Sequence, residues 1–258
     1  KVKSLVYYHS LSKPLALDNP KKTLMARFRY IRKKLFYNFF VDTIITPSKM
    51  GEVDFIKYYG LDKCQVLLNP IEDRFRCFSS PPKNELILGF LGRLDKSKGI
   101  LGFLENFVLY KLNNPKSILK LKIAGPGHLN DHIRNLALQY DFLQFEGSLS
   151  YEKVDSFISK SSFIVIPSIS DNLTTVGVEA LMNGVPIVIS SGSGLSEYIN
   201  DEKEGFKFKY GNEEIIEVLE RLERSSQSRN RMAVDARKTY LKLFSIEEYC
   251  GKMYRLLK

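Results

Sequence analysis

Short apolar segments alternate with amphipathic segments along the 258-residue chain, and this alternation constrains the fold more than any other feature. The apolar segments are rich in β-branched and aromatic residues, as strands are, and the segments between them are long enough for helices. We expect strands at Leu5–His9, Thr43–Pro47, Gln65–Leu68, Leu86–Leu91, Leu119–Ala124, Phe163–Pro167 and Pro186–Ser190. A strict succession of strand, helix and strand predicts an α/β fold in which helices cover both faces of a parallel sheet. Ligands bind such sheets beyond the carboxyl ends of the strands.

The segment Cys77–Lys83 contains two serines and two prolines, which predicts a linker between two units. We expect residues 1–79 to be the C-terminal part of a Rossmann-like domain, because three strands and one long helix are too few for a doubly wound domain. The N-terminal part of that domain is expected to lie upstream of Lys1. Residues 80–240 are predicted to form a complete doubly wound domain, and residues 241–258 a C-terminal helix that packs back toward the N-terminal part.

The chain carries 39 basic and 29 acidic residues, a net charge of +10, which favours anionic partners. Residues 1–80 hold 15 of the basic and 7 of the acidic side chains, so the excess lies in the N-terminal third. No nucleic-acid-binding motif accompanies this charge, and we expect no nucleic-acid partner. Three cysteines without paired spacing predict neither a disulfide framework nor a zinc site. We expect a cytoplasmic protein, because no signal peptide and no apolar run of transmembrane length is visible.

The segment Pro20–Phe40 combines an apolar stripe with many basic residues. The stripe has helical spacing and consists of Leu24, Phe28, Ile31, Leu35 and Phe39. One interpretation is a basic amphipathic helix, residues 21–40, that contacts an anionic membrane and places the protein peripherally at its inner face. The other is a helix that covers the sheet and exposes its basic face to solvent.

A first cluster of interest follows the predicted strand that ends at Gly92. Arg93 lies directly after this strand, and Lys98 and Gly99 lie where a helix begins. Two cations beside the N–H groups of a helix N-terminus form an anion site that suits a diphosphate. Ordinary solvated cations in a βα loop remain the alternative.

A second cluster follows the predicted strand Phe163–Pro167. Asp171 lies in a polar loop, and Glu179 lies eight residues later in a helix that begins near Thr174 or Thr175. A carboxylate in this position can bind paired sugar hydroxyls, as an acidic residue binds a ribose in dinucleotide folds. Alternatively, Asp171 caps the loop and Glu179 interacts with the helix dipole. The chain lacks H-E-x-x-H and Asp-x-Asp sequences, so we expect no metal site.

The two clusters together resemble the retaining glycosyltransferases of family four, which have the GT-B fold. The resemblance rests on Gly-Arg-x4-Lys-Gly and, about 80 residues later, Asp-x7-Glu-Ala-x3-Gly-x-Pro. Further segments resemble the family in the same order: Tyr7–Ser10, Thr46–Ser48, Leu67–Pro70, Lys122–Gly127, Phe145–Ser148 and Ser162–Ser168.

The resemblance implies a role for each matching residue. Arg93 and Lys98 would hold the donor diphosphate in place of a metal, Glu179 would bind the ribose, and Asp171 would bind the transferred sugar. The remaining implied contacts come from Gly92 and Gly125 in the glycine turns, from the backbone N–H groups of Leu173, Thr174, Thr175 and Val176, and from His9 across the cleft.

We therefore expect a metal-independent enzyme that transfers a sugar, with retention, from a UDP-sugar or GDP-sugar to a glycan or lipid-linked acceptor. A UDP-sugar is favoured, no cofactor beyond this donor is expected, and cell-surface polysaccharide or glycolipid is the expected product. The family usually has Glu in place of Asp171 and often Gly in place of Thr174. Two alternatives stay open, a non-catalytic or split nucleotide-sugar-binding subunit acting with a partner protein, and a sugar-nucleotide epimerase.

Overall fold

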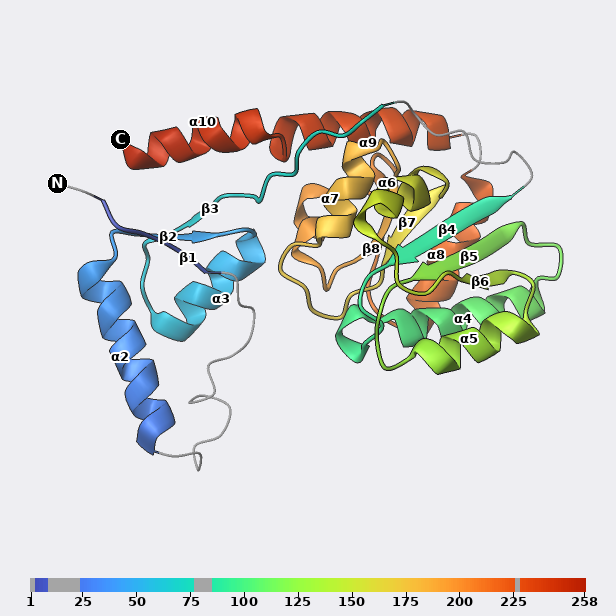
Figure 1. Ribbon diagram of the computed structural model, residues 1–258, viewed down its shortest axis with the longest axis horizontal. Helices are drawn as coiled ribbons and strands as arrows, with labels where there is room; N and C mark the ends of the chain where they lie inside the picture. Colours follow the sequence, from blue (N-terminus) through green and yellow to red (C-terminus); the bar gives the residue numbers. More distant parts are fainter. Residues whose placement is uncertain (1–2, 9–23, 77–84, 226–227) are drawn as a thin grey trace.

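The computed structural model describes residues 3–8, 24–76, 85–225 and 228–258, which contain two parallel sheets (Figure 1). The smaller sheet has the order β1-β2-β3. Its strands are β1 (Leu5–Tyr7), β2 (Thr43–Thr46) and β3 (Cys64–Val66). The helices described beside it are α2 (Leu24–Phe40) and α3 (Lys49–Tyr59).

The larger sheet has the strand order β6-β5-β4-β7-β8-β9, and each neighbouring pair is parallel. Its strands are β4 (Leu86–Leu91), β5 (Leu119–Ala124), β6 (Leu143–Phe145), β7 (Phe163–Ile166), β8 (Ile187–Ser190) and β9 (Gly205–Phe208). From β4 the chain builds the sheet outward through β5 and β6, and from β7 it builds in the opposite direction. The loops after β4 and β7 therefore diverge, and this switch point leaves a crevice at the carboxyl ends of the two strands.

Helices cover both faces of the larger sheet (Figure 1). The helical elements are η1 (Lys96–Lys98), α4 (Ile100–Asn113), α5 (Asn130–Gln139), α6 (Tyr151–Ser159), α7 (Thr175–Met182), η2 (Gly194–Tyr198), α8 (Asn212–Arg224) and α9 (Arg229–Leu243). One core lies under α4, α5 and α8 and receives Phe163 and Val165 of β7. The other lies under α6, α7 and α9 and receives Ile164 and Ile166. Burial on both faces explains why the strand is apolar throughout.

The last helix, α10 (Ile246–Leu257), extends from the larger part of the molecule back toward the smaller sheet (Figure 1). Its first turn is capped by Ser245, whose hydroxyl accepts a hydrogen bond from the Glu248 N–H at 3.3 Å. Near its end, the Leu256 carbonyl accepts from Lys3 Nζ at 3.5 Å. The two ends of the described chain therefore meet beside the smaller sheet.

The predicted parallel α/β fold is confirmed, but the prediction of one helix before residue 77 was wrong. The described residues hold a second helix there, α3, whose ends are fixed by local caps. Ser48 Oγ accepts from the Gly51 N–H at 3.1 Å, and Gly60 closes the helix with a φ of 66°. Strands β6 and β9, which are short, were not predicted either. No helix among the described residues is long and apolar enough to cross a membrane.

Candidate active site

The loop after β4 is held in shape by Asp95. Its carboxylate accepts from Ser97 Oγ at 2.6 Å and from the Lys98 N–H at 3.2 Å, which caps the short helix η1. The hydrogen bond from Ser97 lowers the pKa of Asp95, and Arg93, whose Nη1 lies 3.4 Å away, acts in the same direction. The Arg93 side chain is largely exposed at the mouth of the crevice. Asp95 therefore fixes the loop from which both expected cations project.

The loops after β4 and β7 touch at Gly99. This glycine has a φ of 66° and links η1 to α4. A Cβ atom at this position would lie 1.8 Å from the carbonyl oxygen of Pro167, so only glycine allows this approach. Beside it, the Ile169 N–H donates to the Ser97 carbonyl at 2.9 Å. The contact brings Lys98 to the loop that carries Asp171.

Lys98 and Asp171 form an ion pair at the N-terminus of α7. Lys98 Nζ lies 2.6 Å from Asp171 Oδ2, and both side chains are mostly buried. Thr174 Oγ1 donates to the same carboxylate oxygen at 2.8 Å. Because the Thr174 hydroxyl is used in this way, α7 begins without a side-chain cap. An uncapped helix N-terminus presents backbone N–H groups that attract an anion.

A pocket of about 330 Å³ lies between these two loops at the switch point. Eight of the predicted site residues line it: Gly92, Arg93, Lys98, Asp171, Leu173, Thr174, Thr175 and Val176. Phe90, Leu91, Val165, Ile166 and Ser168, which were not predicted as site residues, complete the lining. All of the lining residues lie at or just beyond the carboxyl ends of β4 and β7, which is where parallel sheets place their ligands.

Gly125, which was also predicted as a site residue, does not line the pocket but packs against Gly92, which does. It has a φ of 139°, and a Cβ atom there would lie 1.8 Å from the Gly92 carbonyl oxygen. The Gly92 N–H donates to the Ala124 carbonyl at 3.1 Å. Gly125 thus supports the turn that follows β4. His9, predicted to reach the sugar, lies outside the described residues.

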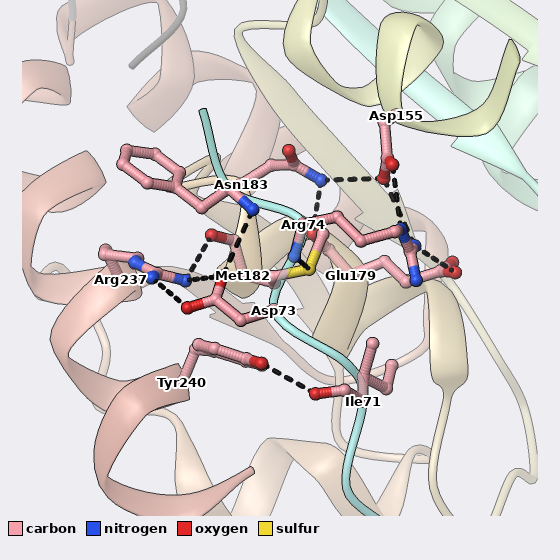
Figure 2. A network of polar contacts seen from close by, with 10 residues as sticks. Ile71, Asp73, Arg74, Asp155, Glu179, Met182, Asn183, Arg237 and Tyr240 are labelled. Atoms are coloured by element: carbon pink, nitrogen blue, oxygen red, sulfur yellow. Dashed lines mark hydrogen bonds and ion pairs between the residues drawn. The ribbon is translucent and has the colours of Figure 1, made fainter. Parts of the chain in front are cut away.

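Glu179 also lies away from the pocket lining, in a polar network beside α6 (Figure 2). Arg74 Nη2 lies 3.3 Å from Glu179 Oε1. The same guanidinium binds both carboxylate oxygens of Asp155, at 2.9 and 3.2 Å. Asn183 Nδ2 donates to Asp155 Oδ1 at 3.2 Å. Glu179 is therefore tied to the segment that connects the two sheets.

The network changes the pKa of both carboxyl groups. Burial raises the pKa of Glu179, and the positive charge of Arg74 acts against burial. Burial would also raise the pKa of Asp155, but hydrogen bonds from Arg74 and Asn183 outweigh it and lower that pKa. The Arg74 guanidinium, paired chiefly with Asp155, has a raised pKa. Arg74 is therefore the cation that favours the ionised form of the buried Glu179.

Arg74 and Asp155 were missed by sequence reasoning because nothing in their spacing marks them. Arg237 anchors the same connecting segment, through hydrogen bonds from its two Nη atoms to Asp73 at 2.9 and 2.5 Å (Figure 2). The Tyr240 hydroxyl donates to the Ile71 carbonyl at 2.7 Å. The connecting segment is thus held against the larger part from Ile71 to Arg74.

The smaller part contacts the pocket loop through the start of α3. Ser48 Oγ donates to Asn172 Oδ1, and Asn172 is the neighbour of Asp171. The Lys49 N–H donates to the Tyr198 hydroxyl at 3.3 Å. The Thr46–Ser48 segment, singled out in the sequence, therefore lies against the loop that carries the pocket carboxylate.

The solved structures that match this arrangement of parallel sheets include GT-B glycosyltransferases. HepE from Anabaena matches with a TM-score of 0.78 at 17% identity, over 98% of this chain and 72% of that one. Staphylococcus aureus TarM matches with a TM-score of 0.78 at 16% identity, over 99% of this chain and 50% of that one. The fold is therefore the GT-B type.

The chain belongs to the family described as glycosyl transferases group 1, whose model matches residues 72–239. An uncharacterized glycosyltransferase of Methanocaldococcus jannaschii is 31% identical over 182 residues, which are 63% of this chain and 45% of that protein. The glycogen synthase of Mycobacterium tuberculosis is 25% identical over 171 residues, 64% of this chain and 41% of that protein. The chain thus spans less than half the length of these curated relatives.

Proposed function

We propose that the chain is a family-four glycosyltransferase that transfers a sugar, with retention, from a nucleotide-diphosphate sugar to a glycan or lipid-linked acceptor. The proposal rests on the ion pair of Lys98 and Asp171, whose charged atoms lie 2.6 Å apart at the uncapped start of α7. Lys98, Arg93 and the N–H groups of the first turn of α7 together present positive charge to one small pocket. A diphosphate is the ligand that this arrangement suits best.

The proposed roles follow the charges in the pocket. Lys98 and Arg93 stabilise the negative charge that develops on the leaving diphosphate, a task that a divalent metal performs in other enzymes. Asp171 accepts hydrogen bonds from hydroxyls of the transferred sugar. In the bound state Lys98 moves from Asp171 toward the phosphates. The smaller sheet forms the acceptor side, and His9 approaches the sugar from there.

A UDP-sugar is the favoured donor. HepE, which shares the fold, has been solved in complex with UDP and with UDP-glucose. The ribose of the nucleotide is proposed to bind Glu179. Because Arg74 contacts only Oε1 of Glu179 at 3.3 Å, the carboxylate keeps this cation while it accepts from ribose hydroxyls.

A thermal-shift experiment tests the donor assignment. UDP at 100 times its dissociation constant is expected to stabilise the chain by about 2.7 kcal/mol, which is roughly 5–11 °C for a protein of this size. We expect smaller shifts with GDP and ADP, the same shift with EDTA in place of magnesium, and no shift for Arg93→Ala. A folded sample that responds to none of the nucleotides would contradict the proposal.

Measurements of turnover distinguish a split or non-catalytic subunit from the proposed enzyme. The relatives are longer than this chain, and Asp171 stands where the family usually has Glu. Nucleotide binding without hydrolysis or transfer of any UDP-sugar would favour the subunit. An epimerase would instead return a changed nucleotide sugar without an acceptor.

Replacing Arg74 by methionine is expected to raise the pH below which nucleotide binding weakens. Loss of the cation leaves only groups that raise the pKa of Glu179, namely burial and the Asp155 charge. Glu179 then takes up a proton at a higher pH and accepts one hydrogen bond fewer from the ribose. The dissociation constant of UDP, measured by calorimetry between pH 5 and pH 8, reports the change.

Arg237→Met is the matched control, since Arg237 anchors the same segment through Asp73 rather than through Glu179 (Figure 2). Both variants should lower the melting temperature. If both substitutions raised the pH below which binding weakens by the same amount, Arg74 would have only a structural role.

A further inference from the structure

The helix α2 presents an apolar face to solvent. Seven of its large apolar side chains are between 48% and 72% exposed: Met25, Phe28, Ile31, Leu35, Phe36, Phe39 and Phe40. Four of these belong to the stripe expected from the sequence. A contiguous apolar surface of this kind is uncommon on a soluble protein and marks an interaction site. The interpretation that the stripe covers the sheet is therefore wrong, because the stripe points the other way.

Two tyrosines on the opposite side hold α2 to the protein. The Tyr30 hydroxyl donates to the Tyr58 carbonyl at 2.5 Å, and its ring stacks on Tyr59 with centroids 5.6 Å apart. The Tyr37 ring lies 5.5 Å from Phe55 and 5.0 Å from Tyr59. All three partners lie on α3, so this narrow seam fixes which side of α2 faces inward.

Helical geometry then places the apolar stripe on the outside. Residues two positions apart are turned by about 200° around a helix axis. Phe28 and Leu35 each precede a seam tyrosine by two positions, and Phe39 follows one by two. These three side chains therefore point away from the seam, which agrees with exposed fractions of 65%, 50% and 72%.

Cations lie within and beside the outward face. The exposed basic residues of α2 are Arg27, Arg29, Arg32, Lys33 and Lys34. The helix contains no acidic residue, so none of these charges has a partner within α2. An apolar face bordered by cations is the pattern of a helix that lies in the interface of a membrane. At 17 residues with five cations, α2 is too short and too charged to span one.

We propose that the outer face of α2 binds an anionic lipid surface. The apolar side chains enter the acyl boundary, and the bordering cations bind lipid phosphates and carboxylates. A second copy of the chain would bring five further cations against the first five, and the upstream part expected for this domain would have to enclose five cations that have no partner within α2. Charge complementarity therefore favours lipid. This inference stands on α2 alone and does not depend on the transferase activity.

The absence of tryptophan from the chain gives a direct test. Phe39→Trp places one indole on the outer face, and Leu138→Trp places one on α5, at a side chain that is 81% exposed. Vesicles of phosphatidylglycerol are expected to move the emission of Phe39→Trp to shorter wavelength and to leave Leu138→Trp unchanged. Vesicles of phosphatidylcholine should have a weaker effect on Phe39→Trp. Thermal unfolding equal to the unmodified chain shows that each variant is folded.

Substitutions of cations on the Phe39→Trp background measure the electrostatic contribution to lipid binding. Arg29→Gln, Arg32→Gln and Lys33→Gln together should weaken binding to phosphatidylglycerol roughly a hundredfold, since each surface cation contributes about fivefold. The matched control carries Lys116→Gln, Lys153→Gln and Lys242→Gln, which are exposed elsewhere. This control should bind as before.

Two results would overturn the proposal. The first is unchanged Phe39→Trp emission with anionic vesicles in a folded sample. The second is short-wavelength emission without lipid that grows with protein concentration, which would show that the face binds a second copy. Neither measurement requires a sugar donor or a sugar acceptor, so both are valid whether or not the chain transfers a sugar.

Discussion

Lys98→Ala is expected to lower kcat/KM for sugar transfer by about 10²- to 10³-fold. The ammonium group lies in the pocket, 2.6 Å from Asp171, on a side chain that is 23% exposed. A cation in this partly desolvated position is worth more than one on the surface, because water screens it less. Under the proposed role of Lys98, its loss removes the positive charge that stabilises the leaving diphosphate. Steady-state transfer with the donor that gives the largest thermal shift measures the effect.

The controls separate a lost cation from a carboxylate left without its partner. Lys96→Ala removes an exposed cation from the same short helix and should leave turnover unchanged. The double variant Lys98→Ala with Asp171→Asn removes the pair together, and it should be no more active than Lys98→Ala. Recovery of activity in the double variant would show that the uncompensated Asp171 caused the loss. In that case the diphosphate role of Lys98 would be wrong.

The pocket could be predicted from the sequence because its residues follow strand ends closely. Arg93 lies two residues after β4, and Asp171 lies five residues after β7. In a parallel sheet the ends of neighbouring strands meet at one edge, so short distances along the chain become short distances in space. The contact between Lys98 and Asp171 follows from the fold even though 73 positions separate them.

The surroundings of Glu179 could not be predicted in this way. Arg74 contacts both Glu179, 105 positions away in the sequence, and Asp155, 81 positions away. It does so from a connecting segment that has no periodic pattern. The direction of the α2 stripe was equally hidden. Periodicity shows that apolar residues share a face of the helix. The contacts of Tyr30 and Tyr37 with α3 determine which face points inward, and the spacing of the apolar residues does not reveal these contacts.

Gly99→Ala is expected to destabilise the chain by about 3 kcal/mol through two effects that act together. A φ of 66° is costly for a residue with a Cβ atom, and the new atom would lie 1.8 Å from the Pro167 carbonyl oxygen. A backbone oxygen cannot turn away as a side chain can, so the loops after β4 and β7 must move apart. The melting temperature should fall by roughly 6–12 °C.

Two other glycines separate these effects. Gly147 has a φ of 67°, but a Cβ atom there would meet no atom within 4 Å outside its neighbours, so Gly147→Ala should cost only about 1 kcal/mol. Gly251 lies within α10 in open space, and Gly251→Ala should stabilise the helix by about 0.5–1 kcal/mol. If Gly99→Ala cost no more than Gly147→Ala, the two loops would not touch. The contact that places Lys98 beside Asp171 would then be absent, and the proposed diphosphate pocket would lose its structural basis.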